Sequence, residues 1–383
     1  MPQIVVQKFG GSSVADADKI RKVAARVKAA VAQGRKLVVV VSAMGETTDD
    51  LLGLARQVSA DPPRRELDML LTCGERISMA LLSMALHELQ VPAISFTGSQ
   101  SGIITDDTHS QARIVEVRPA RIEEELARGK VVIVAGYQGV SRHREVTTLG
   151  RGGSDTTAVA LAAALGADCE IYSDVDGVFS ADPRVVPSAK KLEALSFDEM
   201  QELASAGAKV LNAQAVDFAR EKGITIHART THGAGTGTAI SAVTSSARVK
   251  GVTSDREVWV LSTAGTPDEL LSLLDAHDVK GRTLVVSGGR SLVVVPLQDV
   301  HAPAPLRAKF PASVQVFDEL ATVTCVGAGL DADWSICLEV LAAARALGLE
   351  PTATWSSALQ VSVVVPRASA VALTQRLHQT LIG

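Results

Sequence analysis

Aromatic residues are scarce in this sequence, making up 3% of its 383 residues. The sequence also lacks an excess of positive charge, because the formal net charge is −4 and no stripe of lysine and arginine stands out. Proteins whose main partner is a nucleic acid usually carry a basic face and aromatic side chains for stacking. These two shortages argue against a nucleic-acid partner.

Cysteine is also rare. Cys73, Cys169, Cys325 and Cys337 are scattered and form no C-x-x-C pair, which argues against a zinc site or a disulfide scaffold. No stretch approaches the roughly 18 unbroken apolar residues of a membrane span. The first residues, MPQIVVQKFGG, predict a strand and not a cleavable leader. We therefore expect a cytoplasmic protein with no membrane partner.

Apolar residues, by contrast, make up 46% of the chain, enough for two or three domains with large cores. Up to about residue 245, short Val- and Ile-rich runs alternate with helical patterns, which predicts a mostly parallel sheet covered on both faces. Residues 231–251, rich in Gly, Ser and Thr, are interpreted as the last turns of this domain and a linker. The expected strands are 4–7, 36–41, 93–96, 131–135, 170–173 and 225–228. The expected helices are 17–32, 65–89, 119–128, 155–165, 196–206 and 213–222.

The rest of the chain contains a faint internal repeat. VLSTAGTPDELLSLLDAH is followed by SLVVVP, and VTCVGAGLDADWSICLEVLAAARALG is followed by LQVSVVVP. Each copy predicts a strand, a helix and two strands, and a last helix is expected near 367–381. The expected fold class is α/β, a three-layer domain with a mostly parallel sheet followed by two small α+β modules. One irregular α+β domain is the alternative for this second part.

The loop QKFGGSSV, residues 7–14, ends the first expected strand, where open parallel sheets bind ligands. It contains neither a Walker A loop nor a Rossmann fingerprint. Glycines nevertheless let backbone N–H groups approach phosphate oxygens, and Lys8 adds a point charge. The alternative is an ordinary turn with an incidental lysine.

Two further loops follow expected strands or open a helix. In SAMGETTDDLL, residues 42–52, Thr47 and Thr48 could cap the next helix. In LGRGGSDTTAVALAAALGA, residues 149–167, Ser154 or Asp155 could do the same. Capping leaves an arginine and a glycine pair unexplained, whereas a helix N-terminus fronted by glycines is also an anion site.

The segment YSDVDGVFSADPR, residues 172–184, has two acids, Asp174 and Asp182. They fit polar ligands of a nucleotide or its Mg²⁺, although isolated acids are more often turn residues. Phosphoryl transfer requires cations on the phosphates and an oriented acceptor. From the residues alone, the loops support a phosphate-binding α/β domain.

Five motifs, in this order, resemble those of the aspartate kinases of the amino-acid kinase superfamily. They are KFGGSSV, VVVSAMGETTDDLL, LLTCGERISMALL, TLGRGGSDTTAVALAAALGA and EIYSDVDGVFSADPR. The resemblance implies a kinase domain over 1–245 and ACT-like modules over 255–318 and 319–383. It implies transfer of the γ-phosphoryl group of ATP, with Mg²⁺, to the side-chain carboxylate of L-aspartate, the first step towards lysine, threonine and methionine. It also implies a dimer formed through the ACT-like modules and a possible amino-acid effector.

The resemblance implies residue roles as well. Lys8 would offset charge on the transferred group, Asp155 would orient Lys8 and the reacting groups, and Lys209 would be a second phosphate-side lysine. Arg151 would clamp the α-carboxylate of aspartate, and Glu75 would take its ammonium group. The other residues implied for the aspartate pocket are Thr47, Gly152 and Ser154. The residues implied for the nucleotide are Gly10, Gly11, Ser12, Ser42, Ser173, Asp174, Asp182 and Arg184.

Two segments depart from the family pattern. Asn212-Ala213-Gln214 stands where the family usually has His-Pro-Arg, beside the nucleotide. DVKGRTLVVSGGRS stands where the first module usually has an Asn-Ile-Asp-like strand, which predicts only weak inhibition by lysine and threonine. The alternative functions are a kinase for another acidic amino acid, such as glutamate or an N-acyl derivative, and a non-catalytic amino-acid sensor.

Overall fold

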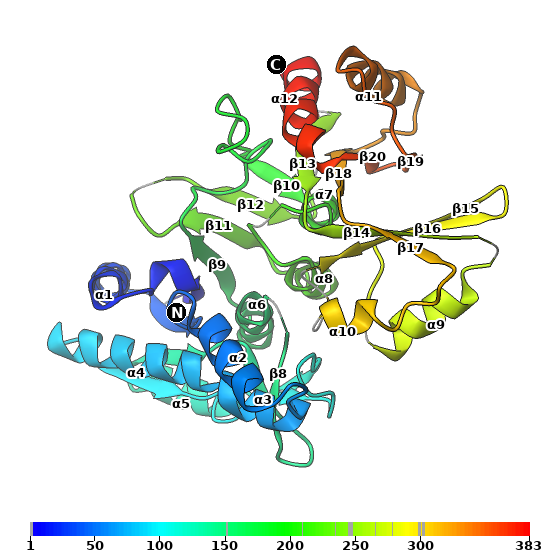
Figure 1. The fold of residues 1–383 in the computed structure, drawn as a ribbon. Helices are drawn as coiled ribbons and strands as arrows, with labels where there is room; N and C mark the ends of the chain where they lie inside the picture. Colours follow the sequence, from blue (N-terminus) through cyan, green and yellow to red (C-terminus); the bar gives the residue numbers. More distant parts are fainter. Residues whose placement is uncertain are drawn as a thin grey trace. The chain divides into compact units, whose positions relative to one another are not determined.

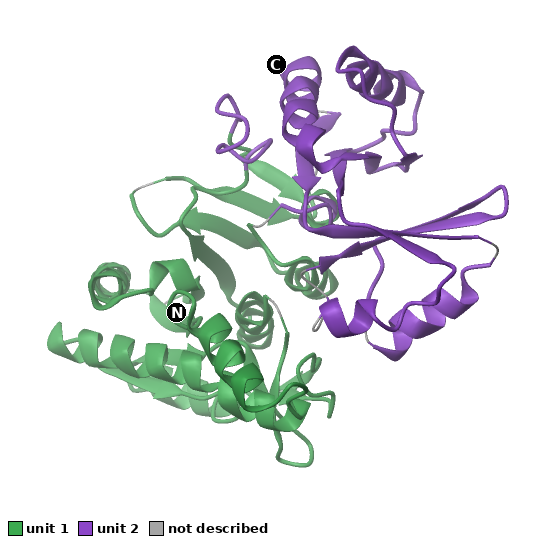
Figure 2. Ribbon diagram, viewed as in Figure 1, with its two compact units in different colours: residues 1–178, 191–201, 209–245 green, residues 179–190, 202–208, 246–383 purple. Residues whose placement is uncertain are grey.

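The structure is a computed structural model, and it divides into two compact units (Figure 2). Unit 1 consists of residues 1–178, 191–201 and 209–245, and unit 2 of residues 179–190, 202–208 and 246–383. The domain boundaries expected from the sequence stay predictions. The residues that the structure describes are 3–150, 152–208, 210–233, 235–243, 248–264, 266–277, 279–297, 300 and 303–383.

Unit 1 is built on an eight-stranded sheet (Figure 1). Its strands are β1 (Ile4–Phe9), β2 (Lys36–Val41), β3 (Ala93–Phe96), β6 (Val131–Ala135), β9 (Asp168–Ser173), β10 (Ala194–Ser196), β11 (Ile226–Thr230) and β12 (Thr238–Ser241). They lie in the order β10-β12-β11-β9-β1-β2-β6-β3, and every pairing except β11 with β12 is parallel. The carboxyl ends of β9, β1, β2 and β6 therefore meet at one edge.

Helices cover both faces of this sheet. Val5 and Phe9 of β1 pack in one core cluster with residues of α1 (Ala17–Ala32) and α4 (Cys73–Glu88). Val6 points to the opposite face and is also buried, since side chains alternate along a strand, and α6 (Gly153–Leu165) contacts β1. The remaining helices are α2 (Thr47–Val58), α3 (Arg64–Leu71), α5 (Ala120–Ala127), α7 (Phe197–Ser205), α8 (Ala213–Lys222) and the 3-10 turn η1 (Gly11–Ser13).

The helix expected over 65–89 is divided at Thr72 into α3 and α4. Among the described residues, this stretch is the one helical run long and apolar enough to cross a membrane by length and composition, and 44% of its most apolar window is buried. Leu71 and Leu82 are among its buried residues, whereas Ile77 and Met84 are exposed.

A second, four-stranded sheet of unit 1 was not expected from the sequence. It contains β4 (Ile103–Thr105), β5 (Ile114–Val117), β7 (Gln138–Ser141) and β8 (Val146–Thr148), in the order β5-β4-β7-β8. The interpretation of residues 231–251 as the last turns of the domain and a linker missed a strand, because β12 lies within them and pairs with β10 and β11. Unit 1 does end within this segment, at residue 245. These strands have only three or four residues each, too few for a period of two to stand out.

Unit 2 contains the predicted repeat. The first copy is β14 (Val258–Ala264), α9 (Asp268–Ala276), β15 (Thr283–Ser287) and β16 (Arg290–Pro296), followed by α10 (Pro303–Arg307) and β17 (Val314–Phe317). The second is β18 (Leu320–Gly327), α11 (Ser335–Ala346), β19 (Ala353–Ser356) and β20 (Gln360–Pro366), followed by η3 (Arg367–Ser369) and α12 (Ala370–Leu381).

The two antiparallel sheets of unit 2 have the orders β15-β16-β14-β17 and, with β13 (Val249–Asp255) included, β13-β18-β20-β19. β13 precedes the first copy in the sequence but pairs with β18 of the second. The expected fold class, an α/β domain followed by two small α+β modules, is confirmed.

Candidate active site

The loops after three neighbouring strands, β9, β1 and β2, are held together by backbone hydrogen bonds. Gly10 N donates to Tyr172 O at 3.2 Å, which joins the end of β1 to the end of β9. Gly45 N donates to Gly11 O at 3.1 Å, which joins the loop after β2 to the glycine loop after β1. The structure thus gathers three loops that the sequence indicated separately.

Lys8 and Asp155 form an ion pair in this site. The Lys8 Nζ and Asp155 Oδ1 atoms are 2.5 Å apart, and their side chains are only 13% and 9% exposed. Asp155 lies in the first turn of α6, where the helix dipole favours a carboxylate. Its other oxygen accepts a hydrogen bond from Asn212 N at 3.3 Å. Two of the predicted catalytic residues therefore act on each other directly.

The N-terminus of α6 is not capped by a side chain. Gly152 is the N-cap residue with a φ of +72°, so the alternative of a cap by Ser154 or Asp155 is wrong. A Cβ on Gly152 would lie 2.3 Å from the Asn212 side chain. A Cβ on Gly136, directly after β6, would lie 2.7 Å from Ser154 Oγ. Glycine at both positions lets the backbone approach the start of α6 closely.

Glu75 is a buried acid with half of its carboxylate unsatisfied. It lies in the first turn of α4 and is 3% exposed. Its Oε1 accepts a hydrogen bond from Ala43 N at 3.1 Å, whereas Oε2 is buried with no hydrogen-bond partner in the described structure. Burial raises the pKa of Glu75 from its ordinary value of 4.5 to about 7. An ammonium group from a ligand would satisfy the free oxygen.

Thr47 belongs to the same corner of the site. Its Cγ2 atom lies 3.7 Å from the position that a Cβ on Gly74 would take, next to Glu75. The capping alternative for Thr47 is wrong, because Glu46 is the N-cap residue and no side chain bonds the start of α2. The Thr47 hydroxyl instead donates to Met44 O at 2.6 Å.

The other predicted nucleotide residues are distributed over both units. Ser12 is exposed in η1, Ser42 is half-buried after β2, and Ser173 ends β9 with the exposed Asp174 beside it. Asp182 and Arg184 lie in unit 2, where they form an ion pair with each other. Arg151 and Lys209 lie outside the described residues.

Two site residues were missed by the sequence analysis. Gly136 follows the buried run VVIVA, and a glycine at the end of a buried strand was a usable signal of close backbone approach. Asn212 was noted only as a departure from the family pattern. Its side chain caps α8 by accepting from Gln214 N and Ala215 N, while its backbone bonds Asp155.

Gly11→Ala is expected to raise the KM for ATP, the nucleotide that the resemblance implies, about tenfold. A Cβ at this position would lie 2.9 Å from Ala43 O and 3.2 Å from Gly45 O, both backbone atoms that cannot rotate away. The matched control is Gly53→Ala in α2, where a Cβ would meet nothing within 4 Å. Steady-state kinetics of both variants checks this, and an unchanged KM in Gly11→Ala contradicts the proposed close contact of the loops.

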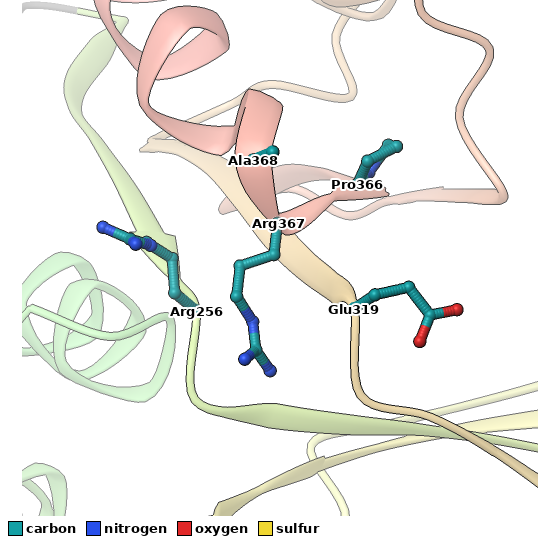
Figure 3. Close-up of a pocket in the computed structure, with 5 residues that line it drawn as sticks. All are labelled: Arg256, Glu319, Pro366, Arg367 and Ala368. Atoms are coloured by element: carbon teal, nitrogen blue, oxygen red, sulfur yellow. The ribbon is translucent and has the colours of Figure 1, made fainter.

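Unit 2 carries a hollow lined by Arg256, Glu319, Pro366, Arg367 and Ala368 (Figure 3). None of the predicted site residues lines it. The two arginine side chains point in different directions in Figure 3, so they do not converge on one point. The hollow therefore gives no sign of the chemistry expected from the sequence.

Comparisons with known proteins agree with the motifs. Residues 3–229 match the amino acid kinase family. The aspartokinase of Mycobacterium tuberculosis is 45% identical over 94% of this chain and 92% of its own. The aspartokinase of Corynebacterium glutamicum is 43% identical over 98% of this chain and 95% of its own.

Solved structures agree as well. Escherichia coli aspartokinase III in complex with aspartate and ADP superimposes with a TM-score of 0.87, covering 100% of both chains, at 24% identity. Aspartate kinase from Synechocystis is 37% identical with a TM-score of 0.58, covering 99% of this chain and 69% of that one. The first of these similarities shows the shared fold.

Proposed function

Because the chain belongs to the amino acid kinase family, and within it to the aspartokinases, we infer that it is an ATP-dependent aspartate kinase. It transfers the γ-phosphoryl group of ATP to the side-chain carboxylate of L-aspartate and yields 4-phospho-L-aspartate and ADP. This reaction begins the route to lysine, threonine and methionine. The observation that carries the conclusion is 45% identity to an aspartokinase along 94% of the chain.

On the phosphate side, Lys8 would neutralise the charge that develops on the phosphoryl group. Asp155 would hold Lys8 in place through the ion pair at 2.5 Å. The loop of Gly10, Gly11 and Ser12 would line the phosphates, and a Cβ on Gly11 would narrow this loop. Ser42 would contribute from the end of β2, and Lys209 would supply a second cation.

Mg²⁺ is proposed as the metal that accompanies the nucleotide. No group of three His, Cys, Asp or Glu side chains suited to a metal occurs in the described parts of the chain. Mg²⁺ usually keeps several waters and is bound through one or two carboxylates and the substrate phosphates. Asp174, exposed at the end of β9, is the acid we propose on that side. When bound, Mg²⁺ would lower the charge on the transferred phosphoryl group.

On the acceptor side, Glu75 would bind the ammonium group of aspartate through its free Oε2 atom. Arg151 would pair with the α-carboxylate, since a guanidinium matches a carboxylate with two parallel hydrogen bonds. Thr47, Gly152 and Ser154 would line the pocket. The resemblance also assigns Ser173, Asp182 and Arg184 to the nucleotide.

The test is an assay of ADP release with ATP, Mg²⁺ and a panel of L-aspartate, L-glutamate and N-acetyl-L-glutamate. Hydroxylamine traps an acyl phosphate as its hydroxamate. We expect ADP and hydroxamate with aspartate. Turnover with only L-glutamate or N-acetyl-L-glutamate contradicts the proposal that L-aspartate is the acceptor. If the folded chain binds ATP but turns over none of these acids, the alternative of a non-catalytic amino-acid sensor is favoured.

We also propose that the chain is cytoplasmic, dimerises through its ACT-like modules and binds an amino-acid effector. E. coli aspartokinase III has been solved with lysine and aspartate in a T-state, which supports an effector in a protein of the same fold. Sedimentation of the purified chain tests the dimer.

Lysine plus threonine at millimolar concentrations are expected to inhibit this chain only weakly. The reason is that DVKGRTLVVSGGRS, which contains β15, replaces the strand that the family uses towards its effector. The same ADP assay, titrated with both amino acids, measures the effect. Strong cooperative inhibition contradicts this expectation.

A further inference from the structure

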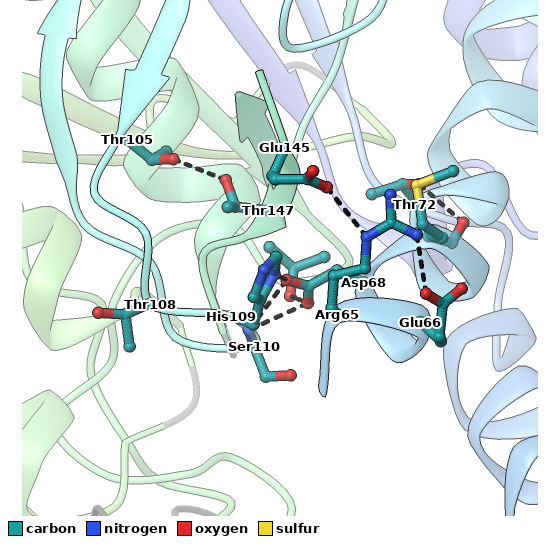
Figure 4. A network of polar contacts seen from close by, with 12 residues as sticks. Arg65, Glu66, Asp68, Thr72, Thr105, Thr108, His109, Ser110, Glu145 and Thr147 are labelled. Atoms are coloured by element: carbon teal, nitrogen blue, oxygen red, sulfur yellow. Dashed lines mark hydrogen bonds and ion pairs between the residues drawn. The ribbon is translucent and has the colours of Figure 1, made fainter. Parts of the chain in front are cut away.

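Asp68 of α3 is a fully buried acid for which the proposed mechanism has no role. Its carboxylate accepts hydrogen bonds from three residues, of which His109 and Ser110 are labelled in Figure 4. His109 Nδ1 lies 2.7 Å from Oδ2, Ser110 N lies 3.0 and 3.1 Å from the two oxygens, and Thr148 Oγ1 donates to Oδ1 at 2.6 Å. Through these hydrogen bonds, the Asp68 carboxylate links α3 to the loop at residues 109–110 and to β8.

The loop is held in a conformation that its residues do not favour. Ser110 has a φ of +69°, in the left-handed region that favours glycine. Both oxygens of Asp68 receive its N–H group, so the acid supports the backbone at the strained position. Conformations of this kind persist where the surroundings fix them, often close to functional sites.

The same loop packs against Gly150, which precedes the predicted anion site. Ser110 O lies 3.4 Å from the position that a Cβ on Gly150 would take. Ala112 N donates to Thr148 O at 2.8 Å, so the loop also pairs with the end of β8. Two residues after Thr148 the chain reaches Gly150, which directly precedes Arg151.

On its other side, Asp68 belongs to the helical stretch that carries Glu75. Asp68 precedes Glu75 by seven residues, about two helical turns. At the break between α3 and α4, Thr72 O accepts a hydrogen bond from Gln138 Nε2 of β7 at 3.1 Å. Asp68 therefore connects α3, which leads along the chain to Glu75, with β8, which leads along the chain to Arg151.

We propose that Asp68 is a positioning residue for aspartate binding, which holds the helical stretch that carries Glu75 in place against β8 and the chain up to Gly150. The inference rests on the proposed function, because that function assigns the ammonium contact of aspartate to Glu75. Among the described residues, Asp68 bonds His109, Ser110 and Thr148, which lie outside the phosphate loop. That loop is held by Lys8–Asp155 and by Gly11–Gly45. Loss of the Asp68 carboxylate is therefore expected to raise the KM for aspartate and to leave the KM for ATP unchanged.

The test compares Asp68→Asn and Thr148→Val with the matched control Thr147→Val. Asparagine keeps the shape of Asp68 but presents an NH₂ group where an acceptor is needed. Thr147 is the neighbour of Thr148 on β8 and is equally buried, but its hydroxyl bonds Thr105 Oγ1 at 2.7 Å and not Asp68 (Figure 4). Kinetics with both substrates and thermal unfolding are measured for each variant.

We expect Asp68→Asn to raise the KM for aspartate at least about tenfold and Thr148→Val about threefold. The KM for ATP should stay within about twofold in both. Thr147→Val should lower thermal stability without changing either KM. Adding Ser110→Gly to Asp68→Asn should recover part of the lost affinity, because glycine adopts a positive φ without support from the acid.

Equal effects of Thr148→Val and Thr147→Val on the KM for aspartate overturn the inference, as does a parallel rise in both KM values. Failure of Asp68→Asn to fold leaves the decision with the Thr148→Val and Thr147→Val pair. A wild-type chain without aspartate turnover refutes the proposed function and this inference together. Turnover by the wild type with an unaffected aspartate KM in the variants refutes this inference alone.

Discussion

Lys8→Ala is expected to lower kcat by about 1,000-fold or more while ATP binding is largely kept. Removing one preorganised charge that stabilises a transition state typically has an effect of this size. The effect falls on kcat because Lys8 would meet charge that develops as the phosphoryl group leaves ADP. ATP binding persists because Gly10, Gly11 and Ser12 still offer backbone groups to the phosphates.

This substitution also leaves Asp155 buried without its partner, and unpaired buried charges destabilise a fold. The double variant Lys8→Met with Asp155→Asn removes both charges at similar side-chain volume. It should recover stability but not turnover, which shows that the loss of turnover in Lys8→Ala does not come from unfolding. Lys22→Ala on the exposed side of α1 is the control for loss of a positive charge.

Single-turnover phosphoryl transfer and ATP binding by calorimetry measure these effects. Turnover within about tenfold of wild type in a folded Lys8→Ala protein contradicts the role given to Lys8. Loss of ATP binding together with turnover assigns Lys8 to ground-state binding of the nucleotide instead. Each result is interpretable because the double variant reports on folding separately.

Glu75→Gln is expected to raise the KM for aspartate by about 10- to 100-fold with little change in the KM for ATP. The reason is the loss of a charge-assisted hydrogen bond from the substrate ammonium group to Oε2. Glu88→Gln near the exposed end of the same helix is the matched control and should change neither KM. An unchanged aspartate KM in Glu75→Gln removes the assignment.

The pH dependence of aspartate affinity should follow the ionisation of Glu75. Burial raises the pKa of this acid to about 7, so the free enzyme carries the charged form mostly above that pH. The KM for aspartate should therefore increase about tenfold between pH 8 and pH 6. Glu75→Gln should remove this dependence, because glutamine does not titrate. A pH-independent KM in the wild type contradicts the role of the charged form.

The stability of the ligand-free protein should change with pH in the opposite direction. A pKa raised from 4.5 to about 7 means that the folded state favours neutral Glu75. The associated stability is present below pH 4.5 and is lost as the pH rises through about 7, to the extent of about 3 kcal/mol. Urea unfolding at several pH values should show this loss in the wild type and not in Glu75→Gln. Saturating aspartate should offset it by pairing the charge.

The sequence by itself determined the elements with strong local patterns. The helix at 17–32, the strand at 36–41 and the helix at 213–222 begin and end at the expected residues, because side-chain periodicity and end signals lie within each segment. The repeat of a strand, a helix and two strands was visible for the same reason. Five motifs in order also identified the family before any geometry was known.

Only the tertiary structure decided which of these residues act on one another. The Lys8–Asp155 pair joins segments far apart in the sequence, and the raised pKa of Glu75 comes from burial by several elements. The pairing of β13 with β18 and the hydrogen bonds of Asp68 are likewise long-range. Such contacts depend on how the sheets bring distant segments together, whereas a local pattern reports only on its own segment.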